Sequence, residues 1–74
     1  MQDELFFYGS MSRTELAMLY APGLKPDNAR RKLNLWIRRN EELLARLTKR
    51  GYTQRLRHFT TGQVRLIMKY LGEP

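Results

Sequence analysis

Apolar residues recur at helical spacing over positions 13–20, and they define one face of a predicted helix: Leu16, Leu19 and Tyr20. Ser12 and Glu15 form a capping box at its start, because the Ser12 hydroxyl can accept from the Glu15 amide while the Glu15 carboxylate accepts from the Ser12 amide. The proline and glycine at positions 22 and 23 then end the helix. The pattern predicts a helix over about 13–20, a Pro22-Gly23 turn and a buried Leu24.

A second helix is predicted from Pro26 to about Arg39. Proline suits the first helical turn, and Asp27 complements the positive end of the helix dipole. At 100° per residue, one stripe collects the apolar side chains Ala29, Leu33, Trp36 and Ile37. A short helix, a turn and a second helix in this order predict a helix-turn-helix, in which the second helix presents its outer face to a partner.

Two further helices are predicted in the second half of the chain. Asn40 is a suitable N-cap for a third helix that ends before Gly51. Thr60 and Gln63 repeat the capping box ahead of a fourth helix, which Gly72 caps. Between them, residues 52–58 lack helical periodicity and are either an extended wing or a loop.

These elements predict a mainly α fold: a small four-helix, helix-turn-helix (winged-helix-like) domain, with room for a short β-pairing at the wing. A length of 74 residues allows one core, so we expect a single domain over 1–74. Residues 1–10, with the apolar run Leu5-Phe6-Phe7-Tyr8, are expected to form an N-terminal arm or strand. The predicted core comprises Leu16, Leu19, Leu33, Trp36, Leu47, Val64 and Ile67.

The charge of the chain favours a polyanionic partner. The net charge is +7, and residues 25–39 hold six lysines and arginines against one aspartate. The predicted base-contacting residues on the outer face of the second helix are Asn28, Arg31 and Asn34. The predicted phosphate contacts are Arg30, Lys32, Arg38 and Arg39, with Arg55 and Arg57 added if residues 52–58 form a wing. The alternative is that these cations only solvate a helix face.

Other classes of function find little support in the sequence. There is no cysteine and one histidine, so we expect no metal site. No glycine-rich phosphate loop and no nucleophile with a nearby base is present, which predicts a protein that is not an enzyme and needs no cofactor. The apolar run Leu5–Tyr8 is too short to span a membrane. We therefore expect a cytoplasmic protein with no membrane partner.

Two blocks of sequence resemble the winged helix-turn-helix domains of MerR-type and excisionase-like proteins. They are Thr14-Glu15-Leu16-Ala17-Met18-Leu19 before a turn that ends in Leu24-Lys25-Pro26, and the later segment from Arg57 to Ile67. The turn is longer here, and the helix predicted over 40–51 occupies the place where the wing of that family begins. This resemblance implies a transcriptional regulator or an accessory factor of a mobile element.

A second resemblance covers nearly the whole chain and is to short uncharacterised proteins from Bacteroides-type bacteria, a domain of unknown function. The segments that carry it are Glu15-Leu16-Ala17-x-Leu19-Tyr20, Ala29-x-x-x-Leu33-x-x-Trp36-Ile37, and Phe59-Thr60-x-x-x-Val64-Arg65-Leu66-Ile67 with the ending Tyr70-Leu71-Gly72-Glu73-Pro74. It implies a fold and a compartment but assigns no activity and no functional residues.

The sequence therefore predicts a nucleic-acid-binding helix-turn-helix protein and favours duplex DNA as its partner, with RNA as the other candidate. The alternative is a non-enzymatic protein-interaction module that binds an acidic partner. Leu35 and Leu66 fall on nominally polar faces, which indicates a contact with a protein partner or a second copy of the chain.

Overall fold

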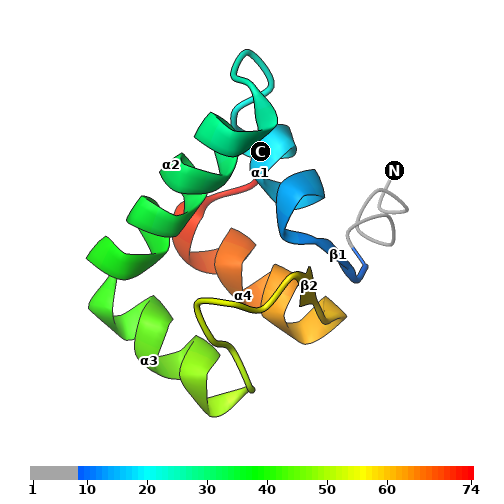
Figure 1. Ribbon diagram of the computed structural model, residues 1–74. Coiled ribbons are helices and arrows are strands. Elements are labelled where there is room, and N and C mark those ends of the chain that lie inside the picture. Colours follow the sequence, from blue (N-terminus) through cyan, green and yellow to red (C-terminus); the bar gives the residue numbers. More distant parts are fainter. Residues whose placement is uncertain (1–8) are drawn as a thin grey trace.

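The computed structural model describes residues 9–74. Its elements, in chain order, are β1 (Met11–Ser12), α1 (Arg13–Tyr20), α2 (Pro26–Arg39), α3 (Glu41–Lys49), β2 (His58–Phe59) and α4 (Thr61–Leu71). The described residues thus form the expected mainly helical domain, with four helices and one short antiparallel sheet (Figure 1). The arm or strand predicted from Leu5-Phe6-Phe7-Tyr8 lies outside the described residues.

Local hydrogen bonds start the helices where the sequence predicted. The Ser12 hydroxyl accepts from the Glu15 amide at 3.0 Å, and the Glu15 carboxylate accepts from the Ser12 amide at 2.8 Å. Thr60 and Gln63 form the same reciprocal pair at the start of α4. The Asn40 side chain accepts from the Leu43 amide at 3.0 Å and caps α3. These caps satisfy amides that have no partner within their helix.

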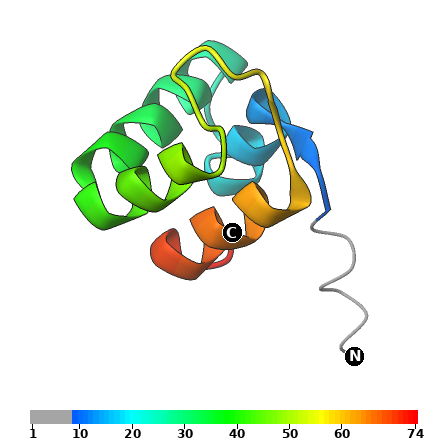
Figure 2. The same cartoon turned by 90° about the horizontal axis from the view of Figure 1, so that it is seen from below.

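The two-stranded sheet joins the segments that lead into α1 and α4. Met11 pairs with Phe59 and Ser12 with His58, and the Arg13 amide extends the pairing by donating to the Arg57 carbonyl at 2.8 Å. Residues 52–57 form a loop, and His58 at its end enters β2. The β-pairing therefore forms between distant segments and not within a hairpin (Figure 2).

The core lies between the four helices and is closed by the loop after α3. The buried apolar residues are Met11, Leu16, Ala17, Ala29, Leu33, Ile37, Leu43, Leu47, Tyr52, Phe59, Val64, Ile67 and Met68. Five of the seven predicted core residues are among them. The helices pack in sequence order, α1 on α2, α2 on α3 and α3 on α4.

Two predictions about buried side chains were wrong, those for Leu19 and Leu24. Leu19 is 43% exposed, because the inward face of α1 is formed by Arg13, Leu16 and Ala17. Leu24 is 37% exposed, because the turn it belongs to lies at the surface. Trp36 packs against the core as predicted, with part of its ring left accessible, and lies edge-on against Tyr20, with 5.9 Å between ring centroids.

The burial of two aromatic rings predicts their relative importance for stability. Phe59 is 0% exposed, so Phe59→Ala should lower the free energy of unfolding by about 3–5 kcal/mol. Trp36→Ala should cost less, since part of the indole already faces solvent. Urea denaturation followed by circular dichroism measures both, with an unchanged m-value as control. An equal loss in the two variants would contradict this ranking.

The capping box of α1 predicts a measurable pH dependence. The hydrogen bond from the Ser12 backbone, then that from its side chain, hold the pKa of Glu15 below its usual value. The stability from this lowered pKa is present above the unfolded-state pKa and is lost as pH falls through the folded-state pKa. Glu15→Gln keeps the box, as Gln63 does in α4. When the pH is lowered from about 6 to about 3, the Tm of this variant should fall less than the Tm of the parent protein. An equal fall in both proteins would contradict a stabilising role of the Glu15 carboxylate.

Candidate nucleic-acid interface

The outer face of α2 carries most of the cations that the sequence singled out. Its buried stripe, Ala29, Leu33 and Ile37, packs on the core and fixes which side of the helix faces outward. The exposed residues among those predicted on this helix are Asn28, Arg31, Lys32, Arg38 and Arg39. Arg30 and Asn34 are half-buried on the side that faces α1 and the loop over 52–57.

A groove runs between α2 and the loop over residues 52–57. It consists of two hollows of about 550 and 390 Å³ that share Arg13, Asn34 and Gln54 in their linings. We call this the basic groove, because cations line both of its walls: Arg30, Arg31 and Arg38 from α2, and Arg55 and Arg57 from the loop. Among the described residues, those that line either hollow include no aspartate or glutamate.

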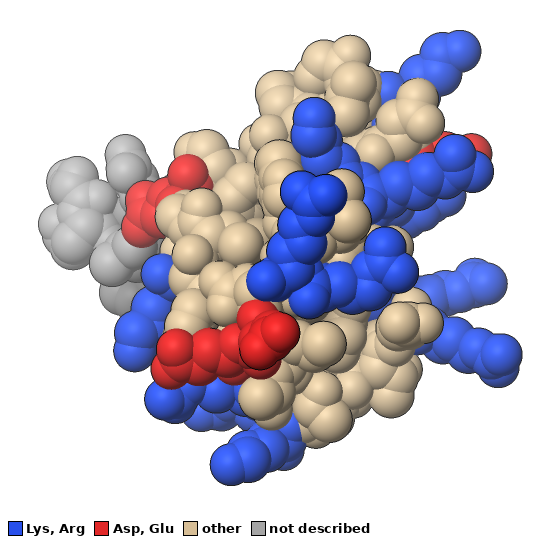
Figure 3. Space-filling model, turned by 90° about the vertical axis from the view of Figure 1, so that its left-hand side faces the viewer, with Lys and Arg blue, Asp and Glu red and all other residues tan. Residues whose placement is uncertain are grey.

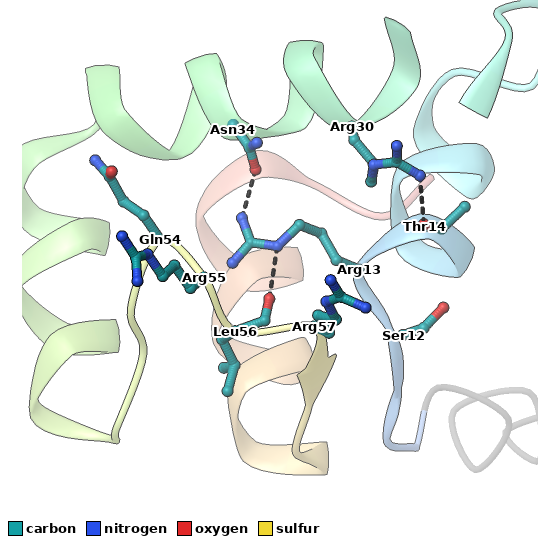
Figure 4. A pocket seen from close by; sticks show the side chains of 9 residues that line it. All are labelled: Ser12, Arg13, Thr14, Arg30, Asn34, Gln54, Arg55, Leu56 and Arg57. Atoms are coloured by element: carbon teal, nitrogen blue, oxygen red, sulfur yellow. Dashed lines mark hydrogen bonds between the residues drawn. The ribbon is translucent and has the colours of Figure 1, made fainter. Parts of the chain in front are cut away.

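Arg13, the first residue of α1, lies between α2 and the loop and is only 6% exposed (Figure 4). Its Nε donates to the Leu56 carbonyl at 2.8 Å, and its Nη2 donates to the Thr53 carbonyl at 3.0 Å. Its Nη1 donates to the Asn34 side-chain oxygen and, at 3.3 Å, to the Tyr52 hydroxyl. One guanidinium thus connects α1, α2 and the loop.

The acceptors around Arg13 are neutral. A buried charge is costly unless hydrogen bonds replace its hydration. Here carbonyls, an amide and a phenol hydroxyl do so, and the guanidinium also lies over the Tyr52 and Phe59 rings, 5.2 and 5.1 Å from their centroids. Sequence analysis did not single out Arg13, although its helical position places it between Leu16 and Ala17 on one face of α1.

Two of the predicted contact residues on α2 already have partners. Arg30 donates to the Thr14 hydroxyl at 3.0 Å and forms an ion pair with Asp27. The Asn34 oxygen accepts from Arg13, so reading adenine with both amide atoms would require Asn34 to release that bond. Gln54, which sequence analysis also missed, lines both hollows from the loop side.

The nine predicted contact residues divide into two groups. Six line the basic groove: Arg30, Arg31, Asn34, Arg38, Arg55 and Arg57. The other three, Asn28, Lys32 and Arg39, do not. The Lys32 ammonium lies 6.0 Å from the Trp36 ring centroid, and Arg39 borders a separate hollow together with Trp36 and Glu41.

Among the charged side chains on the surface over α2 and α3, basic ones cover more area than acidic ones (Figure 3). Lys and Arg side chains spread across this face and several extend beyond it, whereas the acidic side chains form small separate patches (Figure 3). Such a distribution raises the local concentration of polyanions. Within residues 9–74, no group of three His, Cys, Asp or Glu side chains could hold a metal ion. The helices in that range also lack the length and apolar character needed to cross a membrane.

Comparison with known proteins identifies a family. Residues 7–74 match the family described as a domain of unknown function, DUF4248. No curated protein and no solved structure matches the chain.

Proposed function

The chain belongs to the DUF4248 family, and we propose that it binds nucleic acid, with duplex DNA as its partner, through the basic groove and the adjoining face of α2. The observation that carries this proposal is the groove itself. Two segments separated in sequence place arginines on opposite walls, and the residues that line it, all within 9–74, include no carboxylate. A phosphate backbone seated between these walls would release counterions from both sides.

Each part of the surface has a proposed role in the complex. Arg38, Arg55 and Arg57 contact phosphates, which orient the protein but carry no sequence information. Arg31 lies on the exposed face of α2 beside the groove and can reach base edges as this helix enters the major groove. Arg30 contributes less, because Asp27 already neutralises part of its charge.

The aromatic residues within 9–74 favour duplex over single-stranded nucleic acid. Single strands are held largely by stacking bases on exposed aromatic rings. Tyr52, the one aromatic residue in the groove lining described, is 5% exposed and lies against Arg13. Trp36 packs against Tyr20, and the Tyr70 hydroxyl donates to Glu42 at 3.0 Å.

An acidic protein partner has less support. It would need apolar anchors beside the cations. Leu66 is half-buried and packs against the core, and Leu35 is half-buried in the groove wall. Neither residue forms the exposed anchor expected for such a partner or for a homodimer.

Binding should depend steeply on salt. If four to five groove cations neutralise phosphates, log affinity for a random-sequence duplex should fall against log salt with a slope of about −4. Fluorescence anisotropy between about 50 and 200 mM salt measures this slope. The matching single strand and an acidic peptide serve as competitors. The proposal would be refuted if the folded protein does not bind the duplex or binds the acidic peptide more tightly than the duplex.

Two adjacent arginines allow a matched test of the groove. Arg38 and Arg39 are both exposed and end the same helix, but only Arg38 lines the groove. Arg38→Ala should therefore reduce the slope by about 0.9, the value for one phosphate contact, and Arg39→Ala should change it much less. Equal effects would indicate binding by overall charge instead of by the groove.

A further inference from the structure

We infer that Arg13 is a positioning residue: it holds the loop over residues 52–57 at a fixed distance from α2, so that the cations of both walls act on one phosphate strand. This inference rests on the proposed function. It goes further by assigning the geometry of the groove to a side chain that lies beneath its surface and makes no phosphate contact itself.

Within residues 9–74, the loop has few other hydrogen bonds to its surroundings, although the Leu56 side chain packs against the core. Among the hydrogen bonds of the described residues, those that tie 53–57 to another element all involve Arg13. Its guanidinium donates to the carbonyls of Thr53 and Leu56, and its backbone amide donates to the carbonyl of Arg57. The Leu56 amide bonds within the loop, to Thr53. The polar contacts that hold this segment beside α2 therefore come from one residue.

The shape of the guanidinium suits this role. Nε and Nη2 point to two carbonyls three residues apart on the loop, while Nη1 reaches Asn34 on α2. A lysine would keep the charge but offers a single nitrogen, which cannot span these acceptors. Arg55 and Arg57 lie at the groove on the same loop, and Arg30 lines the same hollow from α2 (Figure 4). Their spacing is set by the bridge below them.

The closing experiment measures the salt slope on random-sequence duplex. Arg13→Lys keeps the net charge, so a passive residue would leave the slope unchanged. If Arg13 positions the loop, the slope of Arg13→Lys should become shallower by up to about 1.8, the value for the two phosphate contacts of Arg55 and Arg57. The double variant Arg55→Ala/Arg57→Ala should show the same change. Adding Arg13→Lys to that double variant should produce little further change, because both remove the same contacts.

Asn34→Ala provides a second test in case Arg13→Lys does not fold. A neutral asparagine neutralises no phosphate, so its loss should leave the slope on random duplex unchanged if it only reads bases. Positioning predicts a shallower slope, because Arg13 loses its acceptor on α2. A folded variant of either kind with the parental slope would overturn the inference.

A measurement without ligand separates this inference from the proposed function. Backbone order parameters of residues 53–57 should fall from about 0.85 toward 0.6 or below in folded Arg13→Lys, while those of α4 stay unchanged. If the parent protein binds no duplex but the order parameters fall in this way, the positioning role of Arg13 is supported and only the proposed binding of nucleic acid is contradicted. Unchanged order parameters in the loop would overturn the positioning role whatever the protein binds.

Discussion

The burial of one guanidinium is the interaction on which the rest of the structure depends. Arg13 begins α1, directly follows β1, and provides donors to α2 and to the loop that leads into β2. The loop has no regular secondary structure, and its Thr53 and Leu56 carbonyls, where Arg13 reaches them, are partly shielded from water and need donors from the protein. Arg13 supplies them and thereby connects the first helix to the far half of the chain.

The neutral character of the acceptors has an electrostatic consequence. A carboxylate beside Arg13 would have satisfied the guanidinium and cancelled its charge. Carbonyls, an amide and a phenol hydroxyl satisfy it without adding a negative charge. The floor of the groove therefore keeps its positive charge beneath walls that are also positive, and a low-dielectric surrounding extends the reach of that field.

Local signals made the helices predictable, whereas tertiary contacts decided the rest. The Ser12 and Thr60 capping boxes and the Pro22-Gly23 turn act within a few residues, so the sequence located α1, α2 and α4 well. Leu19 and Leu24 were misplaced because burial depends on which face a neighbour covers. The cations of α2 were predicted as a set. Their division between groove and outer surface was not, because it depends on the path of the loop.

The short β1–β2 ladder also constrains when the domain can form. Its two strands come from opposite parts of the chain, and Arg13 finds its loop acceptors only once residues 53–56 are available. Pairings between distant segments carry a large loop-closure cost and form late. On the ribosome, α1 and α2 would emerge well before the segment that completes their support. Residues 1–50 therefore cannot reach their native packing alone. Folding is completed only after the ribosome has added the loop and β2.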